Sequence, residues 1–190
     1  PNFNVAPTHK IPAIVSKDDE TLMAAFPWGL VPNWAKDPAI GSRMINARSE
    51  TAAEKPSFRS ALVKRRCIVP ADGWYEWKGS PGKKTPFYFS HTNDSVLGLA
   101  GIYETWKQPD GQLLWSAAIL TQGARANFFY IHDRMPVLLT PELQETWLSA
   151  PASPLNEVLD SAASVGIQAW EVSAAVGNVR NNFADLTTNQ

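Results

Sequence analysis

A carboxylate flanked by large aromatic residues is the first candidate for chemistry in this sequence. Glu76 stands between Tyr75 and Trp77 in a short apolar run. Aromatic neighbours in a strand can desolvate a carboxylate and raise its pKa into the range in which it both donates and accepts protons. In the competing interpretation, strand alternation turns Glu76 to solvent while Tyr75 and Trp77 face the core.

A histidine is the second candidate. Of the three histidines, only His132 lies in a dense polar string, Ile131-His132-Asp133-Arg134-Met135-Pro136. Histidine titrates near neutral pH and can carry a proton. Because a lone histidine is more often structural, a catalytic and a structural role both stay open at this point.

A third group of polar residues lies in the string Ile45-Asn46-Ala47-Arg48-Ser49-Glu50-Thr51. The two-sided amide of Asn46 can orient a substrate hydroxyl or a phosphate. Arg48, two residues further on, points to the same side of an extended segment, and its guanidinium fits a phosphate. The alternative is an asparagine in a turn followed by a solvated arginine.

The single cysteine is not a convincing nucleophile. Cys67 precedes Ile68 and Val69, a pattern typical of a buried, inert strand residue. One cysteine allows neither an intramolecular disulfide nor a cysteine-only zinc site and fits a reducing cytoplasm. Because no Ser-His-Asp order, phosphate-binding loop, dinucleotide fingerprint or zinc-ligand spacing occurs, we expect no metal and no cofactor.

Charge and hydropathy restrict the partners. With 17 basic and 18 acidic residues the formal net charge is −1, so the chain lacks the positive field of non-specific nucleic-acid binders. Any DNA contact must therefore be local. Because no apolar run approaches the roughly 18 residues that span a bilayer, we predict a soluble cytoplasmic protein that does not enter membranes.

The elements that must position these residues are mostly strands. A length of 190 residues without repeats or linkers suits one domain. Short apolar or alternating runs predict eight strands, and turns such as Ser80–Lys83 and Pro109–Gly111 predict antiparallel pairing. The predicted strands are Ile11–Val15, Thr21–Trp28, Cys67–Val69, Trp74–Trp77, Pro86–Phe89, Leu97–Tyr103, Leu113–Thr121 and Ile167–Val172.

Helices are fewer. Ser57 is a candidate N-cap for a helix through Lys64 to Arg66, and Thr140 for one through Trp147. Ser153 followed by Pro154 predicts a third helix, and Arg125–Ile131 a short fourth. The predicted fold is α+β, a single domain with a curved, barrel-like, mostly antiparallel sheet and peripheral helices.

Six strings in order give the chain a resemblance to a known family. Together they resemble the SOS-response-associated peptidase (SRAP) family along nearly the whole chain, and chance does not produce six matches in register. The strings are Asn4–Thr8, Trp28–Trp34, Ile45–Thr51, Arg66–Trp77, Ile131–Pro136, and Glu171–Ser173 with Gly177–Val179.

The resemblance implies a covalent reaction with damaged DNA. Members of the family sense abasic sites in single-stranded DNA through a cysteine that becomes the amino-terminal residue when the initiator methionine is removed. Its amine condenses with the ring-opened sugar, and its thiolate then closes a thiazolidine ring. The word peptidase refers to the exposure of that cysteine.

The resemblance also implies that residues 1–190 are an SRAP domain without its amino-terminal segment. The sequence opens at Pro1, which corresponds to a later position in the family, so the catalytic cysteine, an adjoining arginine and an early helix are expected outside it. Either the sequence omits that segment or this homologue has lost it. The presence of Glu76, Asn46 and His132 together favours the first explanation.

Roles for individual residues follow from the resemblance. Glu76 would move protons on the sugar hydroxyl and the imine, His132 would assist sugar ring opening, and Asn46 would hold the substrate. Arg48 and Arg134 would contact phosphates.

Trp34 would stack where duplex meets single strand. The expected partner is single-stranded DNA with abasic sites at replication forks, bound by a monomer that associates with the nucleoid during DNA damage. Two other functions stay open: a non-covalent reader of modified or junction DNA, and a general peptidase.

Overall fold

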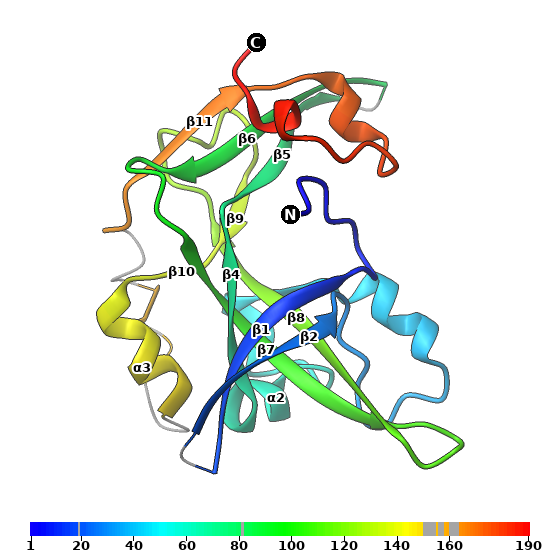
Figure 1. The fold of residues 1–190 in the computed structure, drawn as a ribbon. Coiled ribbons are helices and arrows are strands. Elements are labelled where there is room, and N and C mark those ends of the chain that lie inside the picture. Colours follow the sequence, from blue (N-terminus) through cyan, green and yellow to red (C-terminus); the bar gives the residue numbers. More distant parts are fainter. Residues whose placement is uncertain (19, 81, 150–154, 156–157, 160–163) are drawn as a thin grey trace.

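In the computed structural model, which describes the chain except residues 19, 81, 150–154, 156–157 and 160–163, two β-sheets share one extended segment. Figure 1 shows the smaller sheet above the larger one, with the amino terminus between them. The shared segment leaves the large sheet at Ala71 and enters the small one at Gly73. This crossing brings the Arg66–Trp77 string from one sheet into the other.

The large sheet has eight strands, six of them in the order β2-β1-β4-β7-β8-β3. Strand β10 also pairs with β7, and β9 with β8. All pairs are antiparallel except β3 with β8, which is parallel. The strands are β1 (Lys10–Lys17), β2 (Glu20–Pro27), β3 (Asn46–Arg48), β4 (Arg66–Ala71), β7 (Leu97–Lys107), β8 (Leu113–Gly123), β9 (Arg134–Pro136) and β10 (Leu138–Leu139).

The small sheet has the order β11-β6-β5 and is antiparallel throughout. Its strands are β5 (Gly73–Ser80), β6 (Lys83–His91) and β11 (Ile167–Glu171). Gly73 allows β5 to begin here, because a β-carbon at this position would collide with the Phe89 carbonyl oxygen and the Tyr88 ring. The first residue of β5 therefore fixes how closely this strand approaches β6.

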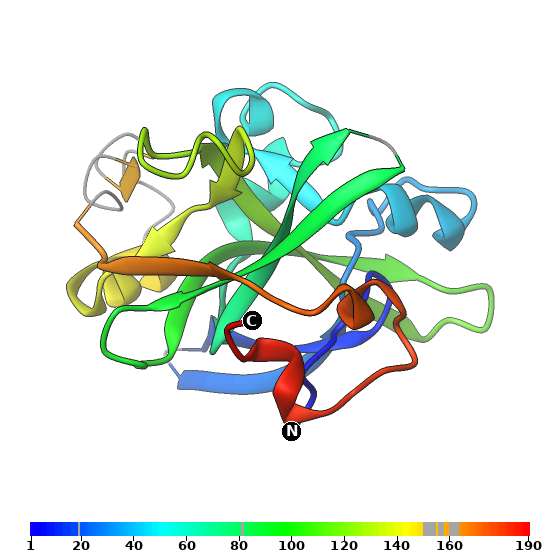
Figure 2. The same cartoon turned by 90° about the horizontal axis from the view of Figure 1, so that it is seen from above.

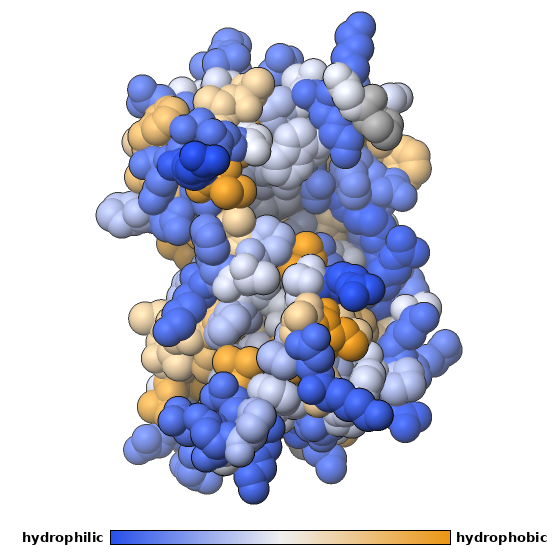
Figure 3. All heavy atoms as spheres, turned by 90° about the vertical axis from the view of Figure 1, so that its right-hand side faces the viewer, coloured by the Kyte–Doolittle hydropathy of each residue, from blue (hydrophilic) through white to orange (hydrophobic). Residues whose placement is uncertain are grey.

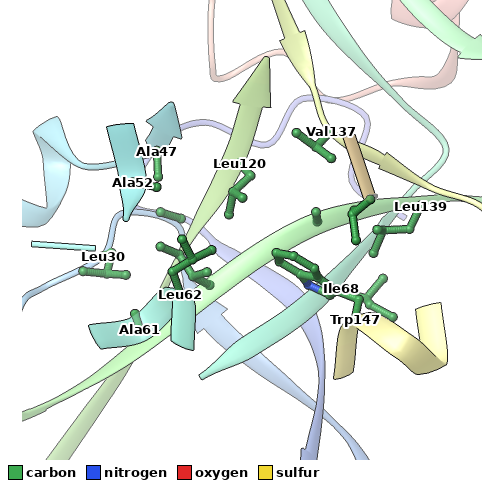
Figure 4. Packing of buried hydrophobic residues seen from close by; sticks show 14 residues of the cluster. Leu30, Ala47, Ala52, Ala61, Leu62, Ile68, Leu120, Val137, Leu139 and Trp147 are labelled. Atoms are coloured by element: carbon green, nitrogen blue, oxygen red, sulfur yellow. The ribbon is translucent and has the colours of Figure 1, made fainter. Parts of the chain in front are cut away.

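Short helices lie on the outside of both sheets. They are α1 (Ser49–Ala52), α2 (Arg59–Lys64) and α3 (Pro141–Ser149), with 3-10 helices η1 (Pro38–Arg43), η2 (Ala174–Gly177) and η3 (Ala184–Thr187). Of these, η2 and η3 lie against the small sheet. Trp147 of α3 is fully buried, donates from Nε1 to the Cys67 carbonyl oxygen at 2.9 Å, and carries the Arg66 guanidinium over its ring. Figure 4 shows Trp147 beside Ile68 and Leu139 in the main core cluster.

The strand predictions are confirmed: each of the eight predicted runs lies in or overlaps a strand, and these eight strands pair with one another in antiparallel fashion. The fold is α+β with antiparallel sheets, as predicted, but the sheet is not closed into a barrel. Strands β3, β9 and β10 were not predicted. They have two or three residues each, too few for a hydrophobic period to show.

The helix predictions fared less well. The Thr140 helix is confirmed as α3, but Ser57 is not the cap of α2, which begins after Phe58 without a side-chain cap. The predicted helix Arg125–Ile131 is wrong; the segment forms successive turns closed by Phe128 N–H to Arg125 and Ile131 N–H to Phe128. The Ser153-Pro154 prediction falls on residues outside those described.

A buried asparagine ties the two ends of the described chain together. The Asn4 amide donates to three carbonyl oxygens near the carboxyl terminus, those of Val176, Asn178 and Asn181, at 3.0 to 3.2 Å. The Tyr75 hydroxyl adds a bond to the Phe3 carbonyl oxygen at 2.8 Å. These bonds hold the amino-terminal segment against the small sheet.

Candidate functional site

Glu76 lies on β5, and strand alternation separates it from its aromatic neighbours as the competing interpretation required. Tyr75 and Trp77 pack in a cluster with Tyr88 and Trp170 on one face of the small sheet. Glu76 points to the other face, beside its pairing partner Phe87. This face is not open solvent, because the Glu76 side chain is only 22% exposed.

Burial raises the pKa of Glu76 to about 7, with a further upward contribution from the Asp133 carboxylate. His132 and Lys84 act in the opposite direction because positive charge favours the carboxylate. A carboxyl group with this pKa exchanges a proton readily at neutral pH. Tyr75 and Trp77, which the sequence had suggested as the cause, lie on the opposite face; the face of Glu76 meets a loop that carries His132 and Asp133.

That loop runs from Ala124 to Asp133, between β8 and β9, and it carries His132. Phe128 and Ile131 are buried in an aromatic cluster with Phe87 and Phe89 of the small sheet. Arg125 donates to the Val165 carbonyl oxygen at 2.5 Å and secures the start of the loop. Apolar anchoring thus places His132 over the face that carries Glu76.

His132 has a partner for its Nδ1 atom in either protonation state. The Arg134 backbone N–H lies 3.1 Å from Nδ1 and donates to it in one neutral tautomer, while the Arg134 carbonyl oxygen, 3.2 Å away, accepts when Nδ1 carries a proton. Glu76 Oε2 lies 3.7 Å from the same nitrogen, and Asp133 Oδ1 lies 3.5 Å away. The Nδ1 atom of His132 therefore lies within 4 Å of two carboxylates, while its hydrogen bonds go to the Arg134 backbone.

Arg134, two residues after His132, has hydrogen-bond partners on two other elements, α1 and β8. Its guanidinium binds Glu50 in a bidentate pair at 2.6 and 2.9 Å and donates to the Thr121 carbonyl oxygen at 2.8 Å. The Arg134 hydrogen bond is the main cause that lowers the pKa of Glu50. Arg134 thus fixes the start of β9 against β8 and α1.

Asn46 and Arg48 lie on β3, which pairs with β8 on the side opposite β9. Both are exposed and Ala47 between them is buried, so the two side chains share one face, as predicted. Arg48 pairs with Thr121, the residue that also binds Arg134, and Arg48 contributes to the lowered pKa of Glu50. The strand β8 therefore brings Asn46 and Arg48 to the region of Arg134 and His132.

Comparison with known proteins identifies the family. The family described as SOS response associated peptidase (SRAP) matches residues 1–179. The chain belongs to the SRAP family.

Relatives and solved structures agree with this assignment. The chain is 40% identical to the abasic site processing protein YoqW of Bacillus subtilis, over 98% of this chain and 85% of YoqW. It is 35% identical to the abasic site processing protein YedK of Escherichia coli, over 97% of this chain and 82% of that protein. A crystal structure of a protein from Bacteroides thetaiotaomicron has a TM-score of 0.80 at 28% identity, covering 96% of this chain and 82% of the other.

In this SRAP chain, Trp34 lies outside the contacts that join Glu76, His132 and Arg134. Trp34 is 55% exposed and, with Lys36, Asp37 and Arg43, lines a hollow of about 390 Å³ beside η1. An exposed indole next to two cations suits contact with DNA. Its role in stacking stays a prediction.

Two residues of the site were not recognised in the sequence. Glu50 stands in the string Ile45–Thr51, where its spacing from Arg48 gave no sign of a partner 84 residues away. Lys84 lies on β6 close enough to Glu76 to lower its pKa. The hairpin register pairs Lys84 with Gly79, three residues beyond Glu76 on β5, which the sequence alone did not give.

Within the described part of the chain, no group of three His, Cys, Asp or Glu side chains is placed to bind a metal ion. Among the same residues, no helix has the length and hydropathy that crossing a membrane requires.

Proposed function

We propose that this SRAP domain processes abasic sites in single-stranded DNA, with Glu76 as the proton carrier and His132 as its partner. The observation that carries the proposal is the carboxyl group with a pKa of about 7, whose Oε2 lies 3.7 Å from His132 Nδ1. Such a pair can move protons in both directions at neutral pH. Relatives that are named abasic site processing proteins support the choice of substrate.

On this proposal the covalent step uses an amino-terminal cysteine of the kind that the family resemblance implies, a residue that is not among residues 1–190. Its amine adds to the aldehyde carbon of the ring-opened sugar, and loss of water gives an imine. The thiolate then adds to the imine carbon, the nitrogen takes up a proton, and a thiazolidine ring closes. Glu76 protonates the departing hydroxyl and the nitrogen, while His132 assists sugar ring opening.

The peptide bond before the cysteine must be cleaved first, and we assign that autopeptidase step to the same site.

DNA binding on this proposal is local. Arg48 is exposed on β3 beside Asn46, so its guanidinium is available to a phosphate and the Asn46 amide to the sugar. Arg134 is engaged by Glu50, so a phosphate contact by Arg134 requires the phosphate to replace that carboxylate. With a net charge of −1, the affinity must come from local contacts and not from an overall positive field.

The test is a denaturing gel. A chain extended at its amino terminus with the cysteine-bearing segment is incubated with single-stranded DNA that carries an abasic site. A DNA–protein band that survives denaturation is the expected result. DNA with a tetrahydrofuran analogue, which has no aldehyde, is the matched control and should give no such band.

A non-covalent reader of modified or junction DNA is the alternative. It would bind both DNAs equally and leave no band on the denaturing gel. The contact between Glu76 and His132 would then be structural, and the raised pKa of Glu76 would have no role in a reaction.

A further inference from the structure

The loop that carries His132 presents two exposed aromatic residues. Phe128 and Ile131 are buried against the small sheet, so Phe129 and Tyr130 between them face outward, 62% and 57% exposed. Their exposure next to Glu76 and His132 is unexpected for a loop that is otherwise anchored by apolar contacts. Exposed apolar groups gathered at one place mark binding surfaces.

Tyr130 is held in a defined orientation by residues of the small sheet. Its ring meets Phe87 edge to face, with centroids 6.4 Å apart and planes at 87°. Lys78 Nζ lies 4.7 Å from the centre of the same ring. Phe87 is the pairing partner of Glu76, and Lys78 lies two residues beyond Glu76 on β5. Both contacts therefore come from the sheet face that carries Glu76.

We propose that Tyr130 is a stacking platform for the unpaired base next to the abasic site. The inference rests on the proposed function, because it takes the bound sugar to lie at Glu76. A base beside an abasic sugar has lost a stacking neighbour, and the Tyr130 ring replaces it. Base–aromatic stacking tolerates any base, which suits a protein that must bind damage in every sequence context.

Charge favours DNA over a protein partner at this surface. Lys78, Lys83 and Lys84 are all exposed on the β5–β6 hairpin, a local concentration of positive charge in a chain of net charge −1. Lysines beside an aromatic ring bind the phosphates on either side of a stacked base. Two rings offer far less apolar area than the roughly 800 Å² per partner of a stable protein interface.

The experiment uses the fluorescent base 2-aminopurine, whose emission falls when it stacks. The probe is placed on the 5′ side of a tetrahydrofuran abasic analogue in one single strand and on the 3′ side in another. Because the analogue cannot form a crosslink, the measurement reports binding alone. We expect the parent to quench the probe at one of the two positions.

Tyr130→Ala should abolish that quenching and weaken binding on the order of tenfold. Tyr130→Phe and Tyr130→Trp keep a ring and should retain both. Quenching that is absent from the parent, or unchanged in Tyr130→Ala, overturns the inference.

Phe183→Ala is the matched control. Phe183 is 47% exposed and immediately precedes η3, which packs through Leu186 in the cluster on the opposite face of the small sheet. Figure 2 shows the carboxyl-terminal segment and the loop 124–133 on different sides of β5 and β6. This variant should quench the probe and bind as the parent does. Crosslinking of true abasic DNA by Tyr130→Ala, measured separately, shows whether the proposed function stands if the stacking inference fails.

Discussion

On one face of the small sheet, Tyr75, Tyr88 and Trp170 pack against the carboxyl-terminal segment; on the other, Glu76 meets the loop of His132. Burial raises a pKa on both faces, with opposite consequences. It raises the pKa of Tyr75 and of Tyr88 to about 12, so both phenols stay protonated. It raises the pKa of Glu76 to about 7, into the range where protons move.

The two faces also differ in their hydrogen bonds. On the packed face, the Tyr75 hydroxyl donates to Phe3 and Trp170 Nε1 to Thr187, both at 2.8 Å. On the other face, the contact of Glu76 with His132 is 3.7 Å, longer than a hydrogen bond. Figure 3 shows the right-hand side of the view in Figure 1, where the outline of the molecule narrows between its upper and lower parts. The packed face therefore stabilises the fold through hydrogen bonds, whereas the Glu76 carboxyl group on the other face has no hydrogen bond to His132.

The largest expected effect is on the face of the small sheet that carries Glu76. Glu76→Gln keeps the shape of the side chain but removes its exchangeable proton, so crosslinking to an abasic site should slow by about 100-fold, with little change in DNA binding. Single-turnover gels with the cysteine-bearing chain measure the rate. Glu20→Gln, on the exposed strand β2, is the control.

His132→Ala should also slow the reaction. If His132 serves ring opening and Glu76 the imine chemistry, an open-chain aldehyde should rescue the histidine variant more than the glutamate variant. Parental rates in Glu76→Gln would show that Glu76 is not the proton carrier.

On the packed face, Asn4→Ala should lower the free energy of unfolding by about 2 kcal/mol. It removes a buried donor that serves three carbonyl oxygens. Urea denaturation gives the change, with the exposed Asn33→Ala as control. Equal stabilities for the two variants would mean that the terminal segments contribute little to the fold.

The pH dependence of stability sharpens the comparison. The pKa of Glu76 is raised from 4.5 to about 7 in the folded state, so its protonated form stabilises the fold below about pH 4.5, and this contribution is lost as pH rises through 7. Glu76→Gln does not titrate. Its free energy of unfolding relative to the parent should therefore increase between about pH 5 and about pH 8, by on the order of 2 kcal/mol. A difference that is constant with pH would contradict the raised pKa.

The smallest effect concerns DNA affinity. Arg48→Ala should weaken binding to all sequences alike and reduce the slope of log affinity against log salt by about one unit, because one phosphate contact is lost. Fluorescence anisotropy at several salt concentrations measures it. Binding that changes for some sequences only would point to base contacts by Arg48.

Much of this protein follows from local sequence. Alternation in runs such as Ile11–Val15 and continuous apolar character in Leu97–Tyr103 predicted the long strands, because burial on one face or on both leaves a direct pattern. Glu76, His132, Asn46 and Arg48 were found as candidates because their residue types and their family strings are local features.

Tertiary structure decided what those residues contact. The Glu76 pKa depends on a loop more than 40 residues away along the chain, and the partner of Arg134 is Glu50 on α1. Strands β3 and β9 form because each pairs with the long strand β8, which supplies the backbone hydrogen-bond partners of these short segments. Desolvation and pairing across the chain are properties of the packed molecule, so the sequence marked the candidate groups while the fold set their environment.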